Sequence, residues 1–324
     1  MSLIEEPRSA PLRHAMFDGR TSFSPPAHSE GGEPPRGSPR IAALLTCYNR
    51  KASTLTSIAR LLKQDFNSDI TVFLLDDKSP DGTGEAVQAR FPSVRLFSGD
   101  GNMFWCGGMR RAFEEALKED FDFYLWLNDD TFLESDALQR LMSSYQSIAS
   151  AGSNRAIVVG STRDPGSGQH TYGGVVRSSR IHPMKYKLLE PGGQPIPCDT
   201  MNGNCVLIPR SVAAVVQNLS PEFRHGIGDF EYGVRARRMG CTVWIAPGYV
   251  GTCAWNQVSG GFLDPQLPLR SRWRHMMSRK GLPPSEHLAY MRRYGGPVWP
   301  LFWMMPYVRI ILGSFWSRLR LRLI

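Results

Sequence analysis

Acidic residues follow directly after two short apolar runs of this 324-residue chain. The first run ends in Asp76 and Asp77, and the second ends in Asn128, Asp129 and Asp130. Adjacent carboxylates are costly to hold together unless a cation or a hydrogen-bonding ligand neutralises them. Because Mg²⁺ and Mn²⁺ bind carboxylate oxygens together with substrate phosphates, each acidic group could form a metal site for a diphosphate. Each group could equally consist of turn or helix-capping acids.

A third acidic element opens a predicted helix over Phe230–Met239, whose other end is basic. Asp229 and Glu231 lie at its start, where negative charge complements the helix dipole. An acid at a helix start that faces a cleft could also deprotonate a hydroxyl group. Both interpretations stay open.

The elements that must position these acids alternate along the chain. Three apolar runs, Ile41–Thr46, Ile70–Leu75 and Phe123–Leu127, are typical of strands buried on both faces. Helical spacing separates them at Ser53–Gln64, Gly84–Arg90 and Met109–Lys118. This alternation predicts an α/β fold with an open, mostly parallel sheet flanked by helices. Ligands of such sheets bind beyond the carboxyl ends of the strands, where the acids lie.

The remaining segments are less regular. Gly99–Gly108 is predicted to be a glycine-bearing loop, and residues 163–193 form a polar, glycine-rich insertion. Further predicted elements are strands at Ile157–Gly160, Cys205–Ile208 and Thr242–Ile245 and a helix at Ser211–Asn218. Residues 1–39 are rich in Pro, Ser and Gly and are expected to be a disordered extension.

The positive charge of the chain is concentrated at its C-terminal end. The net charge is +9, from 38 basic and 29 acidic residues. From Arg270 to Ile324 there are 11 Lys and Arg and one acid, so the other residues carry 27 basic and 28 acidic side chains. A nearly neutral body argues against a nucleic-acid partner, which would need a basic face on the folded domain.

Residues 263–324 are expected to form a basic, aromatic-rich, amphipathic helical tail. Its most apolar part, Pro297–Trp316, is interrupted by Pro300, Pro306 and Arg309, whereas a spanning helix needs about 20 mostly apolar residues. Aromatic residues beside arginines are typical of a segment in the lipid headgroup region. We therefore expect residues 297–324 to bind an anionic membrane surface. The alternative is packing on the core or on a second subunit of a homodimer.

Six cysteines are scattered without a Cys-x-x-Cys pair, which argues against a zinc ribbon and a disulfide scaffold. The N-terminus shows no apolar stretch of the signal-peptide kind. These observations predict a cytoplasmic protein that is peripherally attached to the inner face of the cytoplasmic membrane.

Together the motifs resemble family 2 glycosyltransferases, which have the GT-A fold. The resemblance covers residues 40–262 and rests on the order and spacing of Thr46–Arg50, Asp76–Thr83, Leu127–Asp130 and Asp229–Tyr232. The segment Gly99–Met109 further resembles the rhamnosyltransferase-like branch of bacterial members.

The resemblance implies a donor site at the first strands. Thr46, Tyr48 and Arg50 would border the nucleotide, and Asp76 or Asp77 would hydrogen-bond its base. Residues 128–130 occupy the place of the family's Asp-x-Asp motif. The chief metal ligand, for Mg²⁺ or Mn²⁺, would be Asp130, with Asp129 assisting because Asn128 replaces the first acid.

The resemblance also places residues around the donor sugar and the acceptor. Gly107 and Gly108 would let the backbone approach the sugar diphosphate, and Trp105 would pack on the sugar or, alternatively, in the core. Asp229 would be the catalytic base, preceded by Gly228 where the family commonly has Glu.

His225 would orient Asp229 or be an ordinary loop histidine, and Glu231 would lie on the acceptor side. The metal-binding His that some members carry after the last strand is missing from Pro247–Asn256.

The implied reaction is inverting, metal-dependent transfer of a sugar to a hydroxyl of a glycan or polyprenyl-linked acceptor in bacterial surface polysaccharide synthesis. The resemblance favours dTDP-rhamnose as donor, followed by UDP-linked galactofuranose, glucose or galactose. One alternative is a nucleotidyltransferase, although Leu45–Lys51 lacks the glycines of its first loop. The other is a non-catalytic, membrane-bound scaffold that binds sugar nucleotides.

Overall fold

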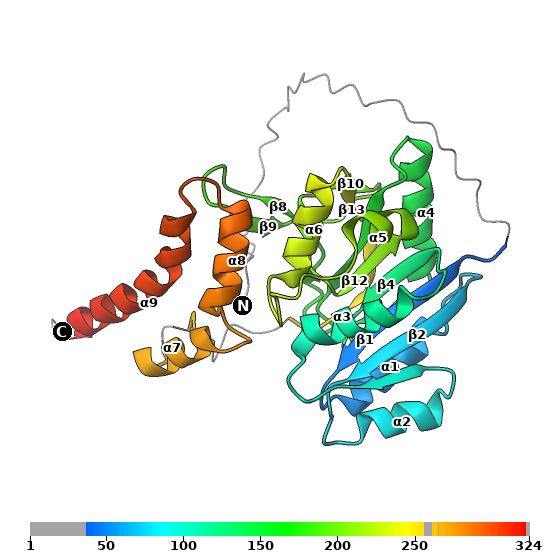
Figure 1. Ribbon diagram of the computed structural model, residues 1–324, viewed down its shortest axis with the longest axis horizontal. Helices are drawn as coiled ribbons and strands as arrows, with labels where there is room; N and C mark the ends of the chain where they lie inside the picture. The colour runs from blue at the N-terminus through cyan, green and yellow to red at the C-terminus, as the bar shows by residue number, and fades with distance from the viewer. Residues whose placement is uncertain (1–36, 256–260, 265, 322–324) are drawn as a thin grey trace.

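A sheet of ten strands forms the centre of the computed structural model, which describes residues 37–255, 261–264 and 266–321 (Figure 1). The strand order is β10-β13-β6-β12-β4-β1-β2-β3, with β5 beside β13 and β7 beside β6. The strands of this sheet are β1 (Arg40–Cys47), β2 (Asp69–Asp76), β3 (Arg95–Ser98), β4 (Phe123–Leu127), β5 (Phe132–Leu133), β6 (Ala156–Arg163), β7 (His170–Tyr172), β10 (Ile196–Pro197), β12 (Cys205–Pro209) and β13 (Thr242–Thr252).

Most of these strands share one direction. β3, β2, β1 and β4 pair in parallel, and β12 runs antiparallel to both β4 and β6. β6 therefore has the direction of β4, as does β13, which is parallel to β6. The predicted mostly parallel sheet is confirmed.

Helices cover both faces of the sheet, as the side-chain alternation of β1 shows. Ile41, Ala43 and Leu45 pack with α1 (Lys51–Leu61), α2 (Thr83–Arg90) and α4 (Ala137–Ser150). Ala42 and Leu44 pack on the other face with α3 (Phe104–Ala116), α5 (Arg210–Val216) and α6 (Gly228–Arg238). The strand is apolar throughout because it is covered on both faces.

One segment differs from the sequence-based expectation. α3 begins at Phe104, so the predicted loop is too long, and Gly107 and Gly108 lie within a helix. A Cβ atom on Gly108 would lie 2.1 Å from Oγ1 of Thr46, so this glycine lets α3 pack closely on β1. The polar insertion contains two strands, β8 (Gly174–Arg177) and β9 (Tyr186–Leu188), which form a small sheet with β11 (Thr200–Met201).

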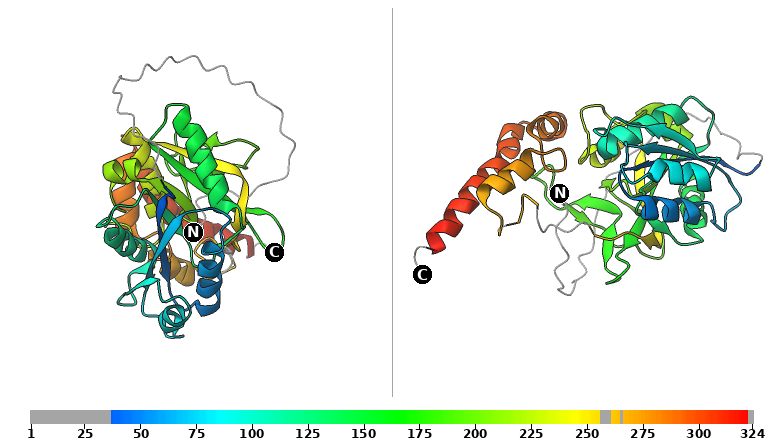
Figure 2. Two further views of the ribbon diagram at one scale, coloured as in Figure 1. Left: turned by 90° about the vertical axis from the view of Figure 1, so that its right-hand side faces the viewer. Right: turned by 90° about the horizontal axis from the view of Figure 1, so that it is seen from below.

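The C-terminal helices α7 (Leu269–Met277), α8 (Pro284–Tyr294) and α9 (Trp299–Leu321) gather at one end of the molecule, next to α6 (Figures 1 and 2). Phe223 and Ile227, which precede α6, share an apolar cluster with Leu282 and Tyr290. The tail is helical, and part of it packs on the body. Of the extension predicted for residues 1–39, residues 1–36 lie outside the described part of the chain.

α9 presents two apolar faces. Phe302, Tyr307 and Ile310 are buried against the neighbouring helices. Side chains on another face are at least two-fifths exposed and follow helical spacing: Leu301, Met304, Met305, Val308, Ile311 and Leu312. Among the residues that the structure describes, no helix is both long enough and apolar enough to cross a bilayer.

Candidate active site

The first acidic pair orders two loops at the carboxyl end of β2. Asp76 accepts hydrogen bonds from the backbone N–H of Ser79 (2.9 Å) and Gly84 (3.0 Å). Asp77 accepts from the backbone N–H of Gly101 (2.8 Å) and Met103 (3.0 Å) at the start of α3. Both carboxylates are buried, and their contacts are those of turn and helix-capping acids. A contact of either one with a nucleotide base stays a prediction.

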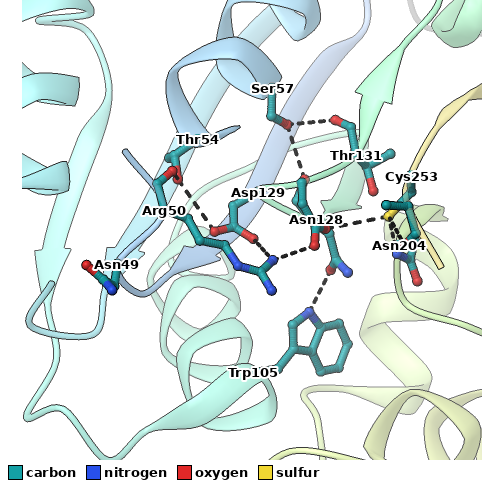
Figure 3. A network of polar contacts seen from close by, with 12 residues as sticks. Asn49, Arg50, Thr54, Ser57, Trp105, Asn128, Asp129, Thr131, Asn204 and Cys253 are labelled. Carbon is teal, nitrogen blue, oxygen red and sulfur yellow. Dashed lines mark hydrogen bonds and ion pairs between the residues drawn. The ribbon is translucent and has the colours of Figure 1, made fainter. Parts of the chain in front are cut away.

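The second acidic group contacts an arginine, and Figure 3 shows Asp129 of this group beside Arg50. Arg50 precedes α1, and its Nη1 atom donates to Asp129 Oδ1 at 3.2 Å and to Asp130 Oδ2. Thr54, one turn into α1, adds a hydroxyl 3.5 Å from the second oxygen of Asp129. Ser57 donates to the carbonyl oxygen of Asn128 at 3.1 Å. The start of α1 therefore holds the acidic turn after β4 in place.

The charges of this cluster do not balance. One guanidinium faces two carboxylates, so the cluster carries a formal charge of −1 when both acids are ionised. Burial raises the pKa of Asp129 to about 7, although Arg50 acts to lower it. When both acids are ionised, a diphosphate approaching this site is repelled unless a further cation is present.

The residues present fit a divalent cation only as part of a substrate complex. The described residues hold no group of three or more His, Cys, Asp or Glu side chains that could bind a metal. Mg²⁺ needs no such group when one or two carboxylates and substrate phosphates bind it. Asp130 suits this role because its side chain is one-quarter exposed, and Asp129 lies beside it. Cys253 directly follows β13, and its Sγ lies 3.6 Å from Asp130 Oδ1.

Asn128 is bound to Trp105 rather than left open for a metal. Nε1 of Trp105 donates to Oδ1 of Asn128 at 2.7 Å (Figure 3). The indole lies edge-on to Trp126, with 5.9 Å between ring centroids, and a Cβ atom on Gly203 would come within 2.4 Å of it. Trp105 thus packs against the core and also borders the cavity described next. Its contact with a donor sugar stays a prediction.

A cavity of about 180 Å³ joins this turn to the start of α6. Asn128, Trp105, His225 and Asp229 are among the residues that line it. The carboxylate of Asp229 accepts hydrogen bonds from the backbone N–H of Gly203 (3.0 Å) and Phe230 (2.8 Å). Burial raises the pKa of Asp229 to about 6, against the effect of these donors. Above pH 6 this side chain can accept a proton inside the cavity.

His225 lines the same cavity and is neutral. Burial, and to a lesser extent the charge of Lys280, lowers its pKa to about 4. Its Nδ1 atom has no hydrogen-bond partner within the described part of the chain. A role of His225 in orienting Asp229 stays a prediction.

Glu231 is not among the residues that line this cavity, and its place on the acceptor side stays a prediction. It is fully buried and accepts hydrogen bonds from Ser220 (3.0 Å), Arg235 (3.1 Å) and Tyr294 (2.7 Å). These contacts join α6 to α8.

The remaining predicted residues border β1 and α3. Thr46 is buried beneath Gly108, whereas Tyr48 is half exposed. The donor-site roles of Thr46, Tyr48, Gly107 and Gly108 stay predictions.

Several cavity residues escape sequence-based prediction. Asn202, Gly203 and Asn204 enter from the turn between β11 and β12, where a polar Asn-Gly-Asn step between two apolar runs could have indicated them. Lys280 and Gly281 enter from the loop between α7 and α8. No sequence pattern connects that loop with the acids, because only tertiary packing brings them together.

Comparisons with known proteins agree with this geometry. The family model described as glycosyl transferase family 2 matches residues 43–213. An N-acetylglucosaminyltransferase of Azorhizobium caulinodans is 31% identical over 115 residues, which is 33% of this chain and 27% of that protein. The chain thus matches about a quarter of the length of this curated relative.

Two solved structures align with the chain, and the first of them shares its fold. The structure of GalNAc-T7 with UDP, GalNAc and Mn²⁺ aligns with a TM-score of 0.53 at 12% identity, over 67% of this chain and 43% of that one. A mannosyltransferase of Pyrobaculum calidifontis in complex with GDP-Man and Mn²⁺ aligns with a TM-score of 0.49 at 14% identity, over 87% and 72%. At such identities the likeness concerns the fold alone.

Proposed function

The chain belongs to glycosyl transferase family 2 and has the GT-A fold, and from this premise we propose that it transfers a sugar from a nucleoside-diphosphate sugar to an acceptor hydroxyl with inversion at the anomeric carbon. The observation that carries this proposal is that Asp229 and Asn128 line the same cavity. This cavity brings a carboxylate that can accept a proton to the acidic turn that the family uses for the donor.

The side chains divide the reaction between them. Asp229 accepts the proton of the acceptor hydroxyl while that oxygen bonds to the anomeric carbon from the face opposite the diphosphate. The bond between this carbon and the diphosphate oxygen breaks, and no covalent enzyme intermediate forms. Arg50 holds Asp129 and Asp130 in one arrangement. A Mg²⁺ or Mn²⁺ ion bound to Asp130 and Asp129 would neutralise charge on the departing diphosphate.

The donor proposed first is dTDP-rhamnose, followed by a UDP-hexose, because Gly99–Met109 resembles the rhamnosyltransferase-like branch. The name of the Azorhizobium relative adds UDP-N-acetylglucosamine to the donors worth testing. The proposed acceptor is a glycan or a polyprenyl-linked saccharide of bacterial surface polysaccharide synthesis.

We also propose that the protein attaches peripherally to the inner face of the cytoplasmic membrane through residues 297–324. Two observations support this location. One face of α9 exposes apolar side chains at helical spacing, and the segment from Arg270 onward carries 11 basic residues against one acid. An apolar face flanked by arginines is typical of helices that lie in the headgroup region of anionic membranes.

The base role of Asp229 is tested by Asp229→Asn. We expect transfer to fall about 100-fold or more, which is the usual effect of removing a general base. The dissociation constant of the donor, measured by calorimetry, should not rise, because the change is nearly isosteric and removes a negative charge from the cavity that receives the anionic donor. The matched control is Asp69→Asn, because Asp69 is an exposed acid at the start of β2, whereas the acidic pair Asp76–Asp77 lies at the end of that strand. Loss of donor binding in Asp229→Asn would remove this residue from the base role.

A further inference from the structure

We infer that Lys280 forms a phosphate-binding subsite in the cavity, supplied by the loop between α7 and α8. The phosphate would belong either to the sugar-nucleotide donor or to a polyprenyl-linked acceptor. In naming these two sources, the inference rests on the proposed function. The loop lies outside residues 43–213, which match the family model. The C-terminal helices would therefore contribute to substrate recognition.

The loop that carries Lys280 is a tight turn. Gly281 donates its backbone N–H to the carbonyl of Ser278 at 2.9 Å, and Leu282 donates to that of Met276 at 2.8 Å. A Cβ atom on Gly281 would lie 2.1 Å from the carbonyl oxygen of His275, so the turn closes over the end of α7 only with glycine there. Leu282 is buried in the cluster that joins the tail to the body.

A neighbouring arginine fixes the turn to the start of α3. Nη1 of Arg279 donates to the carbonyl oxygen of Asn102 at 3.1 Å. Its guanidinium also lies over the ring of Phe104, 5.1 Å from the centroid. Arg279 is therefore engaged in holding the loop, whereas Lys280 lines the cavity that also contains Asp229.

Charge makes Lys280 the cavity's phosphate partner. It is the one Lys or Arg among the described residues that line the cavity. The Arg50 charge is already shared by Asp129 and Asp130. The exposed ammonium of Lys280 forms no ion pair with another described residue, and its charge reaches His225 in the same cavity. A diphosphate in a cavity that also holds an ionised Asp229 is bound only if positive charge lies near the phosphate, and lysine binds phosphate as a mobile point charge.

Calorimetry on the full-length protein tests the subsite with four kinds of probe: inorganic diphosphate, the nucleoside diphosphates UDP and dTDP, the nucleoside uridine, and farnesyl diphosphate as a soluble isoprenoid phosphate. We compare wild type with Lys280→Met and with the charge-retaining Lys280→Arg. Arg274→Met, an exposed change within α7 that lies outside the cavity lining, is the matched control. Thermal unfolding of each variant shows that it is folded.

We expect Lys280→Met to weaken binding of a phosphate-bearing probe about tenfold or more, as for the loss of a charged hydrogen bond. Lys280→Arg should restore most of it, and uridine and Arg274→Met should show no change. If Lys280→Met binds UDP and dTDP more weakly than wild type, the subsite binds the diphosphate of the donor. If Lys280→Met binds only farnesyl diphosphate more weakly than wild type, the subsite binds a phosphate of the acceptor.

Two results would overturn the subsite: equal affinity of wild type and Lys280→Met for all probes, or no binding of any probe by wild type. A failure of the proposed function is seen separately. In that case wild type would bind no sugar nucleotide. The affinities of wild type and the Lys280 variants for inorganic diphosphate could still be compared.

Discussion

Asp229 illustrates how a residue suited to catalysis can oppose stability. Its pKa is about 6 in the folded protein, against about 3.9 in an unfolded chain. The folded state therefore holds the proton more tightly, and the free energy of unfolding decreases as the pH rises from about 4 to about 6. Above pH 6 the cost of an ionised carboxylate in the cavity is fully present.

We therefore expect Asp229→Asn to be more stable than wild type at pH 7.5, by about 1–3 kcal/mol. The difference should shrink toward pH 4, where both side chains are neutral. Thermal unfolding followed by circular dichroism at the two pH values measures it. Asp69→Asn should leave the unfolding temperature unchanged. A variant that is no more stable than wild type at pH 7.5 would show that this carboxylate is not strained by burial.

Among single residues, the residue types were enough to indicate the kind of chemistry, but they did not indicate which contacts each residue makes. The order of the acids along the chain was enough to predict the family and the edge of the sheet. It could not show that Asp77 binds backbone N–H groups or that Glu231 is buried between α6 and α8, because those contacts come from segments far away in the sequence.

Among the elements, α9 combines a packed face with an exposed apolar one. The packed face is held by Phe302, Tyr307 and Ile310. The exposed face has no polar side chain between Leu301 and Leu312 except Arg309. Packing on the body and binding to a membrane are therefore compatible for this helix, although the sequence presented them as alternatives.

The membrane proposal predicts the behaviour of a double variant in α9. Leu301→Glu with Val308→Glu should weaken sedimentation with vesicles of phosphatidylglycerol and phosphatidylcholine about tenfold or more, because two apolar side chains no longer insert and two negative charges are added. Wild type should bind phosphatidylcholine vesicles weakly and lose binding as salt rises. Ile181→Glu, another exposed apolar position, is the control. Unchanged sedimentation of the double variant would contradict attachment through this face.

Element boundaries were predictable where side-chain periodicity was strong. The buried strands β1, β2 and β4 lie within a residue or two of the apolar runs. α3 begins earlier than expected because two glycines normally favour a loop. At Gly108 the reason for glycine is its close approach to Thr46, and such packing cannot be read from local sequence.

For the whole molecule, the +9 charge is best understood as two separate contributions. The body is nearly neutral, and the excess belongs to the C-terminal helices. One part of that segment brings Lys280 to the cavity, and another exposes the apolar face of α9. A charge count can identify the segment, but only the folded arrangement shows that it lies beside the candidate active site.

The most direct measurement is release of nucleoside diphosphate from a panel of sugar nucleotides, including dTDP-rhamnose, UDP-hexoses and UDP-N-acetylglucosamine, with and without Mn²⁺. We expect slow hydrolysis of one donor that depends on the ion, is lost in Asp130→Ala and persists in the control Asp69→Asn. If the wild-type protein neither binds nor hydrolyses any of these donors, the chain is not a nucleotide-sugar transferase. Binding with no ion-dependent hydrolysis or transfer would instead indicate a non-catalytic scaffold.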